Sequence, residues 1–373
     1  LSASLSGAIE AVASTGGQLM PPVMGASAFV LAELVGIPYI EVVKAALIPA
    51  LAYYVSLYFM IDLYARQAGL IQKKTNFELP DEKILKKLHL LLPLIVLIYF
   101  IITSASLQRA AVASIIATVI ISWIRKETRL SPGRIMEALA KGARQALSVS
   151  IPCATAGILI GIVGYTGIGL RLSSLIIAVS GGFLVLAMIL VMIGTIILGM
   201  GMPTSGAYIT AAVLLAPALS ELGISQLGAH LFIFFFAALS MITPPVGLAS
   251  YAAATISGAN LTETGLLAIR LALAGFIVPF AFAINPILLM QGGILSILWS
   301  SGTLFLGVMA LGTSLVGFLF SPLTLPTRIL LLGSAILLIV PERLTDLAGT
   351  ILLAGVLYKE LLFKRSENIP KEI

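Results

Sequence analysis

The chain is a series of long apolar segments separated by short polar stretches. A helix that crosses a bilayer needs about 20 predominantly apolar residues. Segments of this kind occur at 40–62, 88–106, 109–124, 147–166, 228–257, 264–289, 294–319, 327–341 and 346–362. Two more apolar segments, 7–34 and 183–220, carry internal interruptions. The pattern predicts an all-α polytopic membrane protein.

The interruptions contain prolines and glycines. Pro21-Pro22 breaks the first segment, and Pro244-Pro245 breaks the segment 228–257 in the same way. A double proline removes two amide donors and clashes with the preceding turn, so neither segment can be one intact helix. In lipid, a broken helix is tolerated where it lines a cavity or is buried in protein. Two such breaks in corresponding places of two halves indicate a transporter's binding site.

The two breaks belong to an internal repeat. Gly36 and Glu41 recur 222 positions later as Gly258 and Glu263. The Pro-Pro pair recurs 223 positions later, so the first copy has one residue more than the second between its prolines and its glycine. Each copy has the order broken helix, short loop with a glutamate, unbroken helix. A third interruption, Gly199–Gly206, separates two apolar arms and predicts a re-entrant hairpin.

Composition and charge sharpen this picture. The chain has 59% hydrophobic and 10% charged residues and a mean hydropathy of +1.11, whereas soluble domains average about 25% charged. The net charge of +6 arises mainly from basic clusters in 63–87 and 125–146. The positive-inside rule places both clusters in the cytoplasm, so the excess indicates topology and no nucleic-acid partner. Residues 125–146 also show the spacing of an amphipathic surface helix.

Topology gives the copies opposite directions. If the hairpin 183–220 enters and leaves on the outer side, the basic residues Lys364 and Arg365 end in the cytoplasm; a full crossing by 183–199 would place them outside. In the re-entrant topology the first broken helix runs outward and the second inward, as in inverted repeats.

The breaks supply the candidate site. Broken helices expose amide and carbonyl ends at mid-membrane depth, and free oxygens suit sodium, a hard cation. The first group of candidates, the first cluster, is Ser14, Thr15, Gly16, Gln18 and Pro21. The second cluster is Ser240, Thr243, Pro244 and Gly247, facing the hairpin-tip residues Gly199, Gly201, Thr204 and Ser205. The alternative is that these are helix kinks whose small residues serve packing.

Other chemistry has little support. The isolated ionisable or thiol candidates are Glu10, Glu33, His89, Cys153, His230 and Arg270. No Walker A loop, paired intramembrane carboxylates or usual zinc spacing is present, so we expect no enzyme, no cofactor and no metal other than sodium. Glu10 lies about one turn before Ser14 and keeps a sodium/proton antiporter open as an alternative.

Four stretches resemble one transporter family. Residues Gly7–Pro22, Leu198–Thr204, Ala229–Phe232 and Ser240–Val246 resemble the large membrane subunit of TRAP (tripartite ATP-independent periplasmic) transporters, over about residues 7–290. The further C-terminal spans look like those of the fused-permease branch associated with TAXI-type binding proteins. In that branch the small membrane subunit is on the same chain. Because this chain begins at Leu1 without a methionine, we expect that an N-terminal part is absent.

The resemblance implies a function. Sodium-driven uptake would import a small organic acid, often a carboxylate, delivered by a periplasmic binding protein. An elevator-like domain built from hairpins and broken helices would move against a fixed scaffold in a bacterial or archaeal inner membrane. Sodium sites of the family lie at hairpin tips and helix breaks, which correspond here to the two clusters. The family's first hairpin precedes the start of this chain.

These expectations divide the chain into four parts. Residues 1–62 end the first repeat, 63–87 form a cytoplasmic loop, 88–290 form the second repeat, and 291–373 add C-terminal spans and a tail. Besides the antiporter, a membrane assembly subunit without transport activity remains an alternative.

Overall fold

The computed structural model describes residues 1–70, 88–103, 106–340 and 342–367. Regular structure in these ranges is helical, apart from one isolated bridge between Phe318 and Pro322. Four helical stretches are long and apolar enough to cross a membrane: Tyr39–Gln67, Pro132–Thr166, Leu261–Ile284 and Ile294–Val316. The prediction of an all-α polytopic membrane protein is confirmed.

The described residues form a succession of helices. In chain order they are α1 (Ala3–Gly16), α2 (Ala26–Val35), α3 (Tyr39–Gln67), η2 (Leu88–Leu91), α5 (Leu92–Ile102), α6 (Leu107–Ser122), η3 (Lys126–Thr128), α7 (Pro132–Thr166), α8 (Ile168–Ser180), α9 (Leu184–Gly199), α10 (Thr204–Glu221), α11 (Gln226–Leu239), α12 (Leu248–Ser257), α13 (Leu261–Leu271), α14 (Leu273–Ile284), η4 (Pro286–Leu289), α15 (Ile294–Val316), α16 (Leu325–Ile339) and α17 (Arg343–Glu367).

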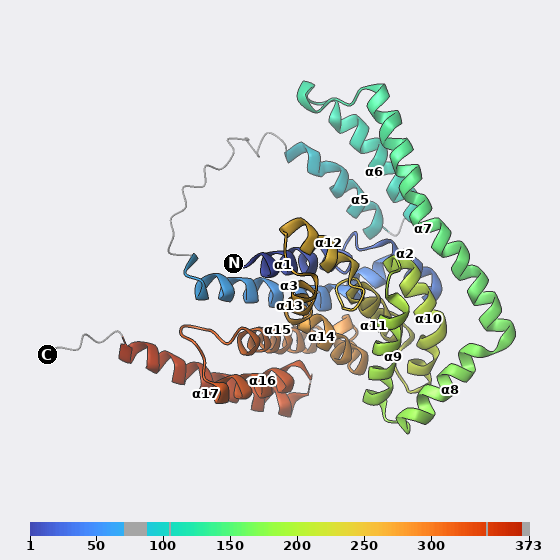
Figure 1. The fold of residues 1–373 in the computed structure, drawn as a ribbon. Coiled ribbons are helices and arrows are strands. Elements are labelled where there is room, and N and C mark those ends of the chain that lie inside the picture. The colour runs from blue at the N-terminus through green and yellow to red at the C-terminus, as the bar shows by residue number, and fades with distance from the viewer. Residues whose placement is uncertain (71–87, 104–105, 341, 368–373) are drawn as a thin grey trace.

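The two broken helices form the centre of the molecule (Figure 1). Helix α1 of the first copy packs against α12 of the second, and α11 of the second copy packs against α2 of the first. These are reciprocal contacts, as a two-fold relation between the copies produces. At the crossing of α1 and α12 the backbones are close, since a methyl group on Gly7 would lie 3.3 Å from the carbonyl oxygen of Ala253.

The hairpin of α9 and α10 stands beside α11, and α8 covers its outer side (Figure 1). Helix α7 runs along the edge of the molecule, from the α5–α6 pair to α8. Here the structure differs from the sequence prediction, which separated a surface helix at 125–146 from a span at 147–166. Ser131 caps a single helix of 35 residues, and no glycine pair or double proline interrupts it before Thr166. The helix therefore continues from the charged part into the apolar part, although Pro152 leaves one hydrogen bond of the ladder unmade.

The C-terminal helices α15, α16 and α17 form a layer against α3 (Figure 1). Gly312 of α15 allows close approach, because a methyl group there would lie 2.8 Å from Cγ of Met60 on α3. The guanidinium groups of Arg270 and Arg328 both donate to the carbonyl oxygen of Leu315 in the last turn of α15. Cations at a helix C-terminus are favourable, so these arginines fasten α15 to α13 and α16.

Two predicted segments meet the limits of the described chain. The predicted cytoplasmic loop 63–87 begins later than expected, because α3 continues to Gln67, and residues 71–87 lie outside the described ranges. The predicted spans 88–106 and 109–124 correspond to η2 with α5 and to α6, and residues 104–105 lie outside the described ranges.

Candidate functional site

The first halves of the two broken helices have the same construction. Helices α1 and α11 are each 14 residues long. Ser2 caps α1 by accepting from the Leu5 amide, and Ser225 caps α11 by accepting from the Gly228 amide. Because a serine cap satisfies a free amide of the first turn, both helices begin in the same way, 223 positions apart.

The helix ends also match. The backbone leaves α1 at Gly17 with φ −58° and ψ −26°, and leaves α11 at Ser240 with φ −58° and ψ −27°. The peptide bond within each Pro-Pro pair is cis. After each break a helix of 10 residues follows, and it ends at a left-handed glycine, Gly36 with φ +72° or Gly258 with φ +67°.

The extra residue of the first copy of the repeat is Met24. The first break runs Pro21-Pro22-Val23-Met24-Gly25, whereas the second runs Pro244-Pro245-Val246-Gly247. Met24 has φ +53°, a left-handed conformation that is uncommon for a residue with a side chain. The extra residue therefore sits in the loop, and the helices on both sides keep their register.

The hairpin tip reaches the second break. A methyl group on Gly199 would collide with Oγ of Ser240 and lie 2.8 Å from its Cβ. Gly201, at φ +74°, lies at the tip, and a methyl group there would be 3.8 Å from Cγ1 of Val246. The glycines are needed because the tip turns sharply and touches the break. Thr204 and Ser205 begin α10 and are buried.

Within the second break, Gly247 and three hydroxyl groups fold the chain on itself. A methyl group on Gly247 would lie 2.9 Å from the carbonyl carbon of Ile242. The hydroxyl of Ser240 donates to the Ala237 carbonyl at 2.8 Å, that of Thr243 to the Leu239 carbonyl at 2.7 Å, and that of Ser250 to the Ile242 carbonyl at 3.0 Å. Each proton is used locally, so the oxygen lone pairs stay available as cation ligands.

The first break is held by tyrosines. Tyr53 and Tyr54 of α3 donate to the carbonyl oxygens of Val12 and Ala13, each at 2.8 Å. Gly16 faces both rings: a methyl group there would collide with Tyr53 and lie 3.0 Å from Cζ of Tyr54. The last turn of α1 is therefore fixed by hydroxyl groups from the neighbouring helix.

The residues of the first cluster are less enclosed than those of the second. Thr15 is buried, Gln18 and Pro21 are half-buried, and Ser14 is exposed. The Ser14 hydroxyl donates to the exposed carboxylate of Glu10 at 2.9 Å. The α9–α10 tip contacts the second break at Ser240 and Val246.

Complementary side-chain sizes join the two breaks. In the repeat register, Gly16 corresponds to Leu239 and Tyr53 corresponds to Gly275. In the first copy, Gly16 faces Tyr53. In the second copy, Leu239 faces Gly275, and a methyl group placed on Gly275 would lie 3.4 Å from Cδ2 of Leu239. Tyr53 and Gly275 also touch each other, since that methyl group would lie 2.8 Å from Cδ2 of Tyr53. The ends of α1 and α11 therefore both pack against the contact between α3 and α14.

A tyrosine hydroxyl also closes each Pro-Pro loop, from different positions. Tyr39, at the start of α3, donates to the Pro22 carbonyl at 2.9 Å, with the Val23 carbonyl also at 3.0 Å. Tyr251 of α12 donates to the Pro245 carbonyl at 2.7 Å. The sequence prediction missed these four tyrosines. The offset of 222 positions carried a signal, because it pairs Tyr53 with Gly275.

The remaining candidates lie elsewhere. Glu33 is exposed on α2. His230 is buried, and its Nδ1 lies 2.8 Å from the hydroxyl of Tyr208. It borders a pocket of about 440 Å³ between α2, α10 and α11, near the base of the hairpin. Among the residues that the structure describes, no group of three or more His, Cys, Asp or Glu side chains gathers to hold a metal ion.

Apolar helices, two broken helices of matching construction and a hairpin tip against one of them define a multi-pass membrane protein of the transporter class. The family model described as the tripartite ATP-independent periplasmic transporter, DctM component, matches residues 2–297, and the chain belongs to this family. The resemblance found in the sequence motifs is thereby confirmed. A search of curated proteins gives no match.

Proposed function

We propose that the chain is the permease part of a sodium-coupled secondary transporter that imports an organic acid, delivered by a periplasmic binding protein. Transport as the permease component follows from the family. The coupling ion, the class of substrate and the delivery are the proposal. Membership of the fused-permease branch and an elevator-type movement of inverted repeats are parts of it.

The observation that carries the proposal is the contact between the hairpin tip and the second break. Helices α10 and α12 both begin there, at Thr204 and Leu248, and α9 and α11 both end there. Helix N-termini favour an anion and C-terminal carbonyls favour a cation. The same few residues thus offer one place for a carboxylate and one for sodium, which suits coupled transport of the two.

The antiporter alternative depends on Glu10. A proton-carrying carboxylate in such a protein is expected to face the bundle interior or a water-filled cavity. Glu10 is exposed in this structure and accepts a hydrogen bond from Ser14. The geometry therefore favours sodium coupling at the second cluster. If a Glu10→Gln change removed a pH dependence of transport, the antiporter would be favoured instead.

The test is a Thr243→Ala variant of the full-length protein in proteoliposomes with its loaded binding protein. Loss of an oxygen ligand should raise the sodium concentration for half-maximal uptake by about tenfold, the size expected for about 1.4 kcal/mol. Thr255→Ala is the matched control, because Thr255 makes the same bond to a carbonyl four residues earlier, at 2.8 Å, away from the tip. Equal sodium dependence of the two variants would remove Thr243 from the ligands.

A further inference from the structure

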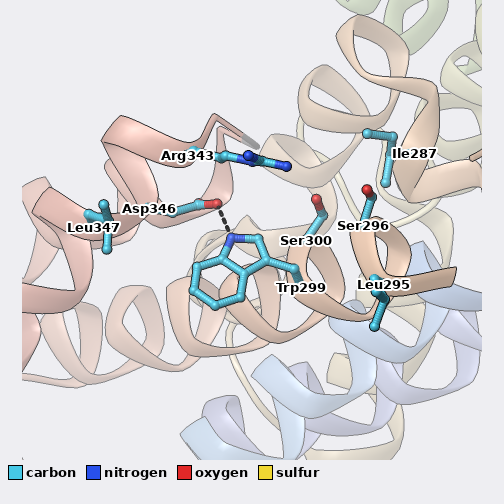
Figure 2. A pocket seen from close by; sticks show the side chains of 8 residues that line it. All are labelled: Ile287, Leu295, Ser296, Trp299, Ser300, Arg343, Asp346 and Leu347. Atoms are coloured by element: carbon cyan, nitrogen blue, oxygen red, sulfur yellow. Dashed lines mark hydrogen bonds between the residues drawn. The ribbon is translucent and has the colours of Figure 1, made fainter. Parts of the chain in front are cut away.

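A second polar site lies in the C-terminal helices, largely beyond residue 297, where the family match ends. A pocket of about 570 Å³ lies between η4 and the first turns of α15 and α17. Figure 2 shows its polar groups: Trp299 and Ser300 on α15 face Arg343 and Asp346 on α17. The site is separate from both helix breaks.

Asp346 is the unusual group of this pocket. Its residue is 1% exposed, and its Oδ2 accepts a hydrogen bond of 2.8 Å from the indole nitrogen of Trp299. The other carboxylate oxygen, Oδ1, is buried without a hydrogen-bond partner among the described residues. The hydroxyl of nearby Thr303 donates to the Ser300 carbonyl at 3.2 Å. Because an unpaired buried carboxylate oxygen is unfavourable, the pocket suits a ligand that brings donors.

Arg343 supplies the opposite charge. It lies three positions before Asp346 on α17, so the two side chains share one face of the helix, about 5–6 Å apart at Cβ. Arg343 is exposed and extends over the pocket toward Ser300 (Figure 2). A guanidinium binds phosphate through paired N–H donors. The pocket therefore offers an acceptor for an ammonium group and, one turn away, donors for a phosphate.

The surroundings of the pocket are lipid-facing. Leu295 is 79% exposed and Leu347 54% exposed, and both line the pocket. In a membrane protein such leucines contact acyl chains, and a tryptophan like Trp299 is typical of the interface. Lys364 lies 18 residues beyond Asp346 on α17, or about 27 Å along the helix. Because the basic end is cytoplasmic by the positive-inside rule, the pocket lies at the outer surface.

We propose that this pocket binds the headgroup of an ethanolamine phospholipid of the outer leaflet. The ammonium group donates to Oδ1 of Asp346, the phosphate accepts from Arg343, and the acyl chains follow the exposed leucines. A choline headgroup carries no N–H donor and a glycerol headgroup carries no positive charge, so neither satisfies Oδ1 in this way.

Trp299 is a built-in probe, because the chain has only one other tryptophan, Trp123. In a Trp123→Phe background, fluorescence is measured in two bilayers. One holds a small fraction of bromine-labelled ethanolamine lipid in unlabelled choline lipid, and the other exchanges the labels. We expect strong quenching only in the first. Equal quenching in both would overturn the proposal, since the pocket would then not distinguish the headgroups.

Variants test the two charges by the lipid retained on the purified full chain in native mass spectrometry. Asp346→Asn and Arg343→Gln should each lower retention of ethanolamine lipid by about tenfold, because a hydrogen bond between charged groups is lost. Glu342→Gln, an exposed neighbour outside the pocket, is the matched control and should retain the lipid. If neither charge variant changes lipid retention, Arg343 and Asp346 only pair with each other. If soluble glycerophosphoethanolamine competes as strongly as the whole lipid does, the pocket binds the free headgroup and not a membrane lipid. Either result contradicts the proposal.

Discussion

The two helix breaks share one backbone path but are supported differently. At the first break, hydroxyl groups of Tyr53 and Tyr54 bind carbonyl oxygens in the last turn of α1. At the second, the position of Tyr54 is taken by Phe276, whose ring lies 6.0 Å from that of Phe236 on α11. The neighbouring helix thus contributes hydrogen bonds at the first break and aromatic packing at the second. This difference indicates that the proline and glycine positions specify a broken helix, whereas the side chains that pack against its end can differ between the copies.

The hairpin tip is the second difference. It closes the second break, where Gly199 allows contact with Ser240, and the first cluster stays more open, with Ser14 exposed. The backbones of the two breaks nevertheless match within about a degree where α1 and α11 end, at Gly17 and Ser240. This comparison ranks the following predictions, from the largest expected effect to the smallest.

Filling the tip contact should have the largest effect. Gly199→Ala places a methyl group against Ser240, and overpacking of this kind costs about 1–3 kcal/mol. We expect the tip to separate from the break and sodium-dependent uptake in proteoliposomes to fall by about tenfold or more, as about 1.4 kcal/mol corresponds to tenfold.

The control for this change lies on the same helix. Gly194→Ala meets only the flexible end of Leu215, at 3.2 Å, and should keep most of the uptake. Adding Ser240→Gly to Gly199→Ala removes the colliding atoms and should restore part of the activity. Full uptake by Gly199→Ala alone would mean that the tip does not need its contact with the second break.

Removing a hydroxyl at the first break should have an intermediate effect. Tyr53→Phe deletes the 2.8 Å bond to the Val12 carbonyl in a buried place and should lower the free energy of unfolding by about 0.5–1.5 kcal/mol. Thermal unfolding in detergent measures the loss. Tyr58→Phe, at a residue that is 77% exposed on the same helix, is the control and should unfold like the parent chain. Equal stability of all three chains would show that polar support at this break is dispensable.

The sequence predicted the breaks because their signals are local. Pro-Pro pairs interrupt a helix whatever surrounds them, and Gly36 and Gly258 permit the left-handed turn at which a helix ends. The repeat, its one-residue difference and the broken helices therefore followed directly from the sequence. The supports did not follow, since Tyr53 and Gly275 meet only after α3 and α14 pack. The continuous α7 was missed for a related reason: a change from charged to apolar residues looks like a boundary, although the backbone has no cause to stop there.

Removing the tyrosine hydroxyls that close the two Pro-Pro loops should have a smaller effect on stability, and the effect should differ between the loops. Tyr39→Phe removes a hydroxyl with two carbonyl acceptors at a residue that is 6% exposed, whereas Tyr251→Phe removes one bond at a more exposed residue. We expect a loss of about 1 kcal/mol for Tyr39→Phe and about half of that for Tyr251→Phe, within the usual range for one hydrogen bond. Unfolding of both variants in the same detergent gives the comparison, and the reverse order would place the tighter loop at the second break.

The smallest effect on stability should come from Ser14→Ala. The side chain is exposed and its hydroxyl donates only to exposed Glu10, so the free energy of unfolding should stay within about 0.5 kcal/mol of the parent chain. This neutrality makes the variant informative about function. If the first cluster holds sodium in the full-length protein, Ser14→Ala should still raise the sodium concentration for half-maximal uptake. A shift without any loss of stability would identify a ligand, because a merely structural hydroxyl would change both quantities or neither. An unchanged sodium dependence would leave the second break as the cation site that the described residues support.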